Sequence, residues 1–184
     1  MKFLDRVLRH WRVSVGSRYI RPNDKVLDIG CFDGYLFETL HSKPIQPSIG
    51  LDPLLKTVTT KGKHTLIPGK FPENVPENSE IDCIVMLAVL EHIPREQQKM
   101  FNQDFFRVLN SSGRVIITVP SPFVDYILAA LTKLRLIDGM SVDEHYGFKI
   151  DEVFSLLDKQ KFKLVKHKKF QFGLNNLFVF EKLS

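Results

Sequence analysis

The stretch KVLDIGCFDGYLFETL, residues Lys25–Leu40, decides the fold. Its first part, Lys25–Gly30, is typical of a buried strand, and Gly34–His41 is typical of a short helix, with a glycine turn between them. In many α/β proteins a strand that joins a helix through such a turn holds a nucleotide-like ligand. The residues of this turn therefore bear on which ligand it would accept.

Strands and helices alternate on either side of this stretch. The apolar runs predict strands, which are Ser48–Asp52, His64–Ile67, Ile81–Leu90, Arg114–Pro120, Phe162–Phe172 and Asn175–Lys182. The segments with helical signals are Pro53–Thr60, Pro94–Leu109, Ser121–Leu136 and Asp151–Lys159. This order predicts an α/β fold, a Rossmann-like doubly wound sheet of mostly parallel strands with helices on both faces. The last two strands are expected to form an antiparallel hairpin, and ligands are expected at the carboxyl ends of the parallel strands.

Length and composition bound the domain organisation. The chain has 184 residues, of which 43% are hydrophobic, so we expect one domain over residues 1–184. Residues 1–21 are predicted to hold an amphipathic helix with its arginines opposite an apolar stripe. The stripe consists of Phe3, Leu4, Val7, Leu8 and Trp11.

The chain carries no signal for a membrane span, a leader or a metal site. The apolar stretch Pro122–Met140 is interrupted by charged residues, and residues 1–20 have arginines spread through them, so we expect a cytoplasmic protein. Cys31 and Cys83 lie in no disulfide or zinc pattern, and no metal is expected. The net charge of +5 comes largely from the two ends of the chain, where solvated basic faces are a commoner explanation than a nucleic-acid partner.

The charges near the glycine turn favour a cationic ligand. A dinucleotide fold needs G-x-G-x-x-G to receive a pyrophosphate, whereas Gly30 and Gly34 have the spacing G-x-x-x-G, and the carboxylates of Asp28 and Asp33 lie close to them in the sequence. Asp52 ends the next strand 22 positions after Gly30, where a carboxylate can bind both hydroxyls of a ribose. Capping a helix after Pro53 is the alternative role for Asp52. The ligand thus resembles a nucleoside attached to a cationic amino acid.

The motifs VLDIGCFDGYL, IGLDP, GKFPENVPENSEIDCIVMLAVLEHIP and GRVIITVP, in this order, resemble those of the class I S-adenosylmethionine-dependent methyltransferases. The chain is most similar to the small-molecule group that includes the quinone-biosynthesis methyltransferases. The resemblance implies S-adenosylmethionine as cofactor and a sheet of seven strands whose last strand is antiparallel. It also implies a set of cofactor-binding residues, namely Asp28, Gly30, Cys31, Phe32, Gly34, Asp52, Pro53, Phe71, Leu87 and Ala88. Of these, Asp28 would lie near the methionine ammonium, the backbone around Phe71 would contact the adenine, and Leu87 and Ala88 would contact the methionine end.

Two residues depart from the family pattern. Family members usually have glycine at the position of Phe32 and, at the position of Lys70, an acidic residue that holds the adenine amino group. The loss of that hydrogen bond weakens binding by about 1 kcal/mol if water replaces it. These departures motivate an alternative from another class, a non-catalytic binding module with a methyltransferase-like fold.

Transfer of the methyl group needs no covalent role for a side chain, but an oxygen nucleophile would need a base. His92 and His145 are the candidates for this catalytic role. Alternatively, His92 caps the start of a helix, and His145 is a surface-loop residue. Residues 121–150 are expected to cover the substrate. The expected partner is a small or lipophilic methyl acceptor, with the first helix resting on an anionic membrane surface in the sharper version of this hypothesis. Methylation of RNA is a further alternative, suggested by the basic ends of the chain.

Overall fold

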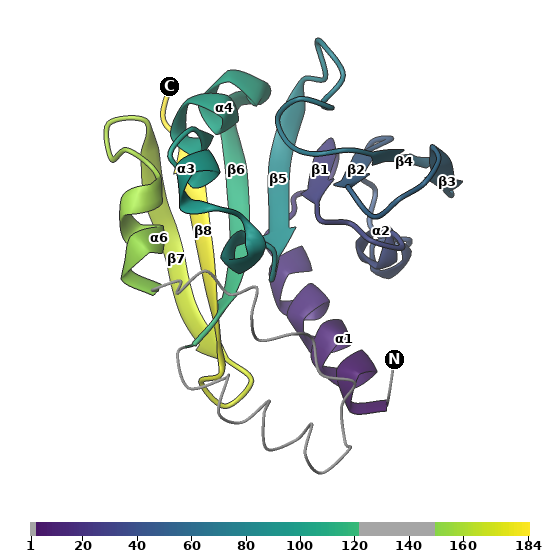
Figure 1. Cartoon of the computed structure of the whole chain (residues 1–184), viewed down its shortest axis with the longest axis horizontal. Helices are drawn as coiled ribbons and strands as arrows, with labels where there is room; N and C mark the ends of the chain where they lie inside the picture. Colours follow the sequence, from purple (N-terminus) through teal and green to yellow (C-terminus); the bar gives the residue numbers. More distant parts are fainter. Residues whose placement is uncertain (1–2, 122–149) are drawn as a thin grey trace.

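The computed structural model describes residues 3–121 and 150–184. The strands are β1 (Val26–Ile29), β2 (Ile49–Asp52), β3 (Thr59–Lys61), β4 (His64–Pro68), β5 (Ile81–Leu87), β6 (Leu109–Pro120), β7 (Phe162–Phe170) and β8 (Asn175–Lys182). The helices are α1 (Phe3–Ser17), α2 (Tyr35–Thr39), the 3₁₀ helix η1 (Leu90–His92), α3 (Arg95–Gln98), α4 (Phe101–Val108) and α6 (Ile150–Leu156). All the described strands belong to one twisted sheet, which Figure 1 shows from one face.

The sheet has the order β3-β4-β2-β1-β5-β6-β8-β7. The five strands from β4 to β6 pair in parallel, whereas β8 is antiparallel to both β6 and β7, and β3 is antiparallel to β4. All four residues of β1 are buried, as is typical of a central parallel strand covered on both faces. The predicted α/β fold with an antiparallel last strand is confirmed, and so is the closing hairpin.

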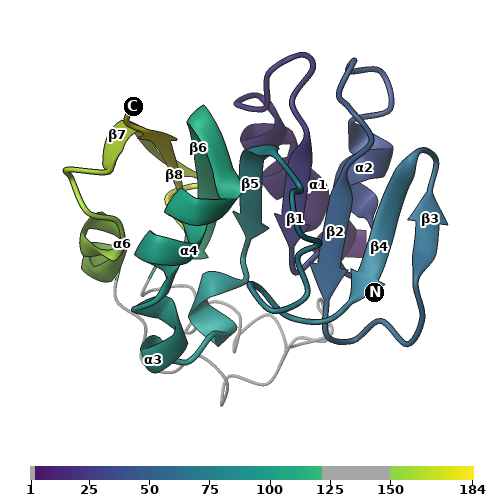
Figure 2. The same cartoon turned by 90° about the horizontal axis from the view of Figure 1, so that it is seen from above.

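Helices cover both faces of the sheet, as Figure 2 shows from above. Alternate residues of β1 point to opposite faces, so Val26 packs in the core under α1 and α2, and Leu27 packs in the core under α4 and α6. On the α4 side, Phe101 and Phe105 are stacked with ring centroids 5.0 Å apart. The sheet is therefore held between two apolar layers, which leaves its carboxyl edge for polar residues.

The helix predicted over Pro53–Thr60 is absent, because a turn and the strand β3 occupy these residues. Thr59 and Thr60 are β-branched, and in this chain they pair with β4 through a short hairpin at Gly62. The sheet consequently has eight strands rather than seven. The helix predicted from Pro94 is also divided, into α3 and α4.

The apolar stripe of α1 packs against the core only in part. Val13, Val15 and Gly16 at the end of the helix are buried, and a Cβ added at Gly16 would lie 3.0 Å from Leu87 Cδ2 at the end of β5. Phe3, Val7 and Trp11 are instead exposed to solvent. Arg9, which the sequence places opposite the apolar stripe, turns toward the glycine turn.

Phe105→Ala should lower the free energy of unfolding by about 3–5 kcal/mol, because Phe105 is fully buried against Phe71 and Phe101. Urea denaturation followed by circular dichroism measures the change. Phe172→Ala is the matched control, since Phe172 is exposed and the same truncation there should change the stability by less than about 0.5 kcal/mol. Equal effects of the two substitutions would contradict the packing described.

Candidate functional site

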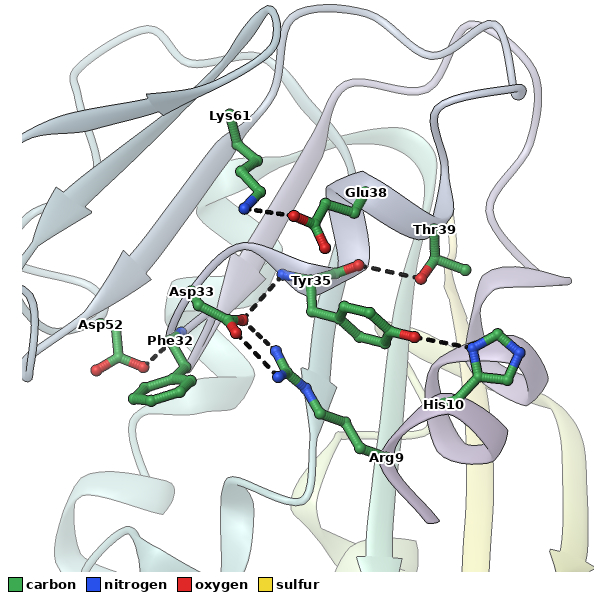
Figure 3. Close-up of polar contacts among 9 residues, drawn as sticks. All are labelled: Arg9, His10, Phe32, Asp33, Tyr35, Glu38, Thr39, Asp52 and Lys61. Atoms are coloured by element: carbon green, nitrogen blue, oxygen red, sulfur yellow. Dashed lines mark hydrogen bonds and ion pairs between the residues drawn. The ribbon is translucent and has the colours of Figure 1, made fainter. Parts of the chain in front are cut away.

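The glycine turn is bound to the end of β2 by backbone hydrogen bonds. The carbonyl of Leu51 accepts hydrogen bonds from the amides of Gly30 and Cys31, at 2.8 and 3.1 Å. The amide of Phe32 donates to Asp52 Oδ2 at 2.8 Å (Figure 3). The turn, Asp28 and Asp52 thus lie together at the carboxyl edge of the sheet, as the sequence predicts.

Position 30 requires glycine because of its backbone conformation and because a side chain lies close to it. Its φ is +77°, and a Cβ at this position would lie only 2.3 Å from Val89 Cγ2. Val89 follows β5, so this contact brings the end of β5 against the turn after β1. Sequence reasoning missed Val89, because the contact spans two distant segments and has no local signal.

Phe32 occupies a backbone conformation that favours glycine. Its φ is +48°, in the left-handed region, which costs a residue with a Cβ about 1–2 kcal/mol. The ring is 55% exposed and lies 5.9 Å from the guanidinium carbon of Arg9. Phe32 therefore takes a conformation that glycine would adopt at lower cost and adds an exposed aromatic surface to the turn.

An ion pair joins α1 to the glycine turn. Arg9 donates to both carboxylate oxygens of Asp33, one of them at 3.0 Å, and its guanidinium carbon lies 4.4 Å from the centroid of the Tyr35 ring. The Tyr35 hydroxyl is 2.9 Å from His10 Nδ1, which adds a second link to α1 (Figure 3). Partial burial raises the pKa of Asp33, but the hydrogen bonds and charge of Arg9 outweigh it and leave the pKa lowered. Asp33 also accepts a hydrogen bond from the amide of Tyr35, the first residue of α2, at 3.2 Å.

Asp28 is a buried carboxyl group next to this turn. Burial and then the nearby charge of Asp52 raise the pKa of Asp28 to about 8, although Arg9 opposes this shift. The same burial, together with Asp28 and Asp52, raises the pKa of the Cys31 thiol, which is therefore neutral at physiological pH. A cation placed beside Asp28 would stabilise its ionised form, so the site can receive a positively charged group.

The carboxylate of Asp52 holds two loops by hydrogen bonds and can still accept further hydrogen bonds. Its Oδ1 accepts from the amide of Leu54 at 2.8 Å, and its Oδ2 accepts from Phe32. This bond to Leu54 forms a turn at Pro53, because no helix follows there to be capped. Each oxygen has a second lone pair, so Asp52 can still accept hydrogen bonds from two hydroxyls.

The end of β5 supplies the other side of the site. Ala88 has φ +58°, and its amide donates both to the carbonyl and to Oγ1 of Thr118 on β6, each at 3.0 Å. Sequence reasoning missed Thr118. The Leu87 side chain packs toward Gly16 of α1, and His92 is the half-buried last residue of η1. His145 and the expected substrate cover lie outside the described residues, apart from Ser121 and Ile150 at its ends.

Phe71 and Lys70 follow β4, at the predicted adenine end of the site. The ring of Phe71 lies in the core, with its centroid 5.7 Å from Phe101 and 5.2 Å from Phe105. Lys70 is exposed, and its amide donates to Asn74 Oδ1 at 2.9 Å. The Phe71 side chain is thus largely buried, and contact of its backbone with an adenine stays a prediction.

Comparison with known sequences identifies related proteins. Residues 2–167 match the family model of a methyltransferase domain. The chain is also 24% identical over 140 residues to the mitochondrial ubiquinone biosynthesis O-methyltransferase of Dictyostelium discoideum. This match covers 66% of the chain and 43% of that relative, so the chain spans less than half the length of the curated protein that it matches.

Solved structures share the fold over nearly the whole chain. One of them is a chain in a Haloferax volcanii complex of the Trm112 methyltransferase activator with a methyltransferase. It aligns with this chain at a TM-score of 0.69 and 14% identity, and the match covers 96% of this chain and 91% of that one. The 1,6-didemethyltoxoflavin-N1-methyltransferase of Burkholderia thailandensis, bound to its substrate and S-adenosylhomocysteine, has a TM-score of 0.67 and 15% identity. That match covers 94% of this chain and 77% of the other. At these identities the likeness establishes the fold.

Arg9→Gln should loosen α1 from the glycine turn, because it removes the ion pair with Asp33 and the cation–π contact with Tyr35. Each contact is worth about 0.5–1 kcal/mol at an exposed position, so the loss of both should make amide hydrogen exchange in α1 roughly five- to thirtyfold faster. Mass spectrometry of exchanged peptides measures this rate. Arg18→Gln, just beyond α1, should leave it unchanged, and unchanged exchange in Arg9→Gln would contradict a role of the pair in holding α1.

Proposed function

The chain belongs to the family of methyltransferase domains, and on that premise we propose that it transfers the methyl group of S-adenosylmethionine to a small or lipophilic acceptor. The observation that carries the proposal is the group formed by Asp28, the turn Gly30–Gly34 and Asp52 at one edge of the sheet. The Dictyostelium and Burkholderia relatives are named as methyltransferases of small molecules, which supports this acceptor class. Activity, cofactor and acceptor are each open to direct measurement.

The residues of the site suit the proposed cofactor. Asp52 would bind the ribose hydroxyls, and Asp28 would lie near the ammonium of the methionine part. The turn from Gly30 to Gly34, with Cys31 and Phe32, would pack against the ribose and methionine, and the backbone at Ala88 would border the methyl group. The sulfonium supplies an electrophilic methyl group, so the protein mainly has to align donor and acceptor and exclude water.

An oxygen acceptor would also need to lose a proton. We assign this role to His92, which follows β5 at the carboxyl edge of the sheet, or to His145 in residues 121–150. A neutral imidazole near its ordinary pKa can accept a proton at physiological pH. A nitrogen acceptor would need a base less, so the dependence of the rate on these histidines would report the kind of atom that is methylated.

A lipophilic acceptor would place the enzyme beside a membrane rather than across it. Among the described residues, the structure contains no helix with the length and hydropathy needed to cross a bilayer. A cytoplasmic enzyme with peripheral membrane contact is the arrangement we propose. The first helix, which carries both arginines and exposed apolar residues, is the element best placed for that contact.

Asp52→Ala should weaken binding of S-adenosylhomocysteine by about 100-fold, because two hydrogen bonds to a charged acceptor are worth about 3 kcal/mol. Isothermal titration calorimetry measures the affinity, and thermal unfolding verifies that the variant folds. Asp104→Ala is the control, since Asp104 lies on α4 and forms an ion pair with Arg107 there. Unchanged affinity would remove Asp52 from the site. Failure of the unaltered protein to bind either S-adenosylmethionine or S-adenosylhomocysteine would favour a non-catalytic binding module.

Affinity for the cofactor should rise with pH until Asp28 is ionised in the free protein. Its pKa there is about 8, so below this pH a bound ammonium must displace a proton from Asp28. Asp28→Asn cannot titrate, and the ligand's own ionisation is the same for both proteins. The ratio of unaltered to variant affinity, measured by calorimetry, should therefore increase by up to about tenfold per pH unit below pH 8 and then level off. A constant ratio between roughly pH 6 and pH 9 would contradict the role of Asp28.

A further inference from the structure

Two distant parts of the chain place exposed apolar side chains side by side. From α1 come Phe3, Val7 and Trp11, which are 74%, 40% and 37% exposed. From the turn between β7 and β8 comes Phe172, which is 93% exposed. The rings of Trp11 and Phe172 meet edge to face, with centroids 5.6 Å apart. We call these four residues the aromatic patch.

The aromatic patch is fixed in place by polar contacts at its base. Gln171 donates from Nε2 to the carbonyl of Leu8 on α1 at 2.7 Å, and Asn175 donates to Gln171 Oε1 at 2.6 Å. Gln171 and Phe172 both have positive φ, 51° and 57°, although neither is glycine. These are the two central positions of a hairpin turn that a backbone hydrogen bond of 3.1 Å closes, and such turns have positive φ at both positions. The turn thus presents the Phe172 ring to solvent.

The inward arginine of α1 explains why the patch faces solvent. Arg9 is drawn toward the sheet by Asp33, and the opposite side of α1 must then face outward. That side borders a hollow of about 660 Å³ with a largely apolar lining, formed by Phe3, Arg6, Val7, His10, Trp11, Ser14 and Tyr35. An apolar hollow on the outer side of a helix can receive acyl chains or apolar side chains.

Basic residues lie on the same side of the sheet as the aromatic patch. Arg6 borders the hollow itself and is exposed. On β7, Lys168 precedes Phe170 by two positions and so points to the same face of the sheet, where Phe170 packs in the core beneath α1. Lys168 is also exposed. Exposed aromatic rings flanked by lysine and arginine complement an anionic lipid surface, where rings enter the interface and cations meet headgroups.

We propose that the aromatic patch docks on an anionic lipid bilayer. The patch lies toward the carboxyl ends of the parallel strands, because α1 extends from the end of β5 and the β7–β8 turn lies at the same end of the molecule (Figure 1). Docking there turns the edge that carries Asp28 and Asp52 toward the membrane. This use of the patch rests on the proposed function, since it would let a lipophilic acceptor enter the site from the bilayer.

Trp11 makes the proposal directly measurable, because it is the only tryptophan of the chain. With vesicles of phosphatidylcholine and phosphatidylserine, the emission of Trp11 should shift to shorter wavelength and the protein should sediment with the vesicles. Added salt should weaken this binding, and vesicles of phosphatidylcholine alone should bind less. Phe172→Ser should reduce partitioning roughly ten- to hundredfold, since a phenylalanine side chain no longer enters the interface.

Val7→Ser and Val58→Ser form a matched pair of variants. Both remove one exposed valine, but Val7 belongs to the aromatic patch and Val58 lies beside β3 at the far edge of the sheet. Vesicle binding should fall for Val7→Ser and stay unchanged for Val58→Ser. The proposal would be overturned if Val7→Ser, Val58→Ser and Phe172→Ser all bound the vesicles equally well. It would also be overturned if the unaltered protein bound neither kind of vesicle.

Two further outcomes would assign the patch to another occupant and overturn the proposal. Trp11 emission that is already short in wavelength and protected from iodide quenching without vesicles would mean that the chain itself covers the patch. Self-association that is lost in Val7→Ser, measured by light scattering, would mean that a second copy does. Titration of the same variants with S-adenosylhomocysteine keeps the proposed function separate, because loss of cofactor binding with intact vesicle binding would count against the function alone.

Discussion

The site depends on the hydrogen bonds that join the end of β2 to the turn after β1. One carbonyl, that of Leu51, accepts from Gly30 and Cys31, and one carboxylate, that of Asp52, accepts from Phe32. These bonds join the end of β1 directly to the end of β2. They also keep Asp52 close enough to Asp28 to raise its pKa, so one set of contacts determines both the shape of the site and its preference for positive charge.

Sequence patterns predicted the fold and the meeting of Asp28 with Asp52, because buried apolar strands and the spacing of a strand–turn–helix unit are local signals. The pair Arg9–Asp33 is different, since its partners are 24 positions apart and neither residue has an unusual neighbourhood in the sequence. The wrong helix over Pro53–Thr60 has a similar cause. The preference of Thr59 and Thr60 for a strand is realised only because β4 offers them a partner.

Helix α1 shows how charge can override an apolar pattern. A stripe at helical spacing ordinarily faces the core, yet here the carboxylate of Asp33 draws Arg9 inward. Arg12 is also turned inward, where burial lowers the pKa of its guanidinium and the nearby charge of Glu91 opposes that shift. Two arginines directed toward carboxylates leave the aromatic residues of the same helix outside, so the electrostatics of the site and the exposed apolar surface have a common origin.

The position of β8 between β6 and β7 constrains the order in which the protein can form during synthesis. The residues of β7 leave the ribosome before those of β8, but β7 pairs with no other described strand. The nascent chain must therefore keep β7 and the edge of β6 unpaired until β8 emerges, with the apolar residues of both exposed. Completion of this side of the sheet therefore waits for β8, and chaperones that bind open sheet edges can act in that interval.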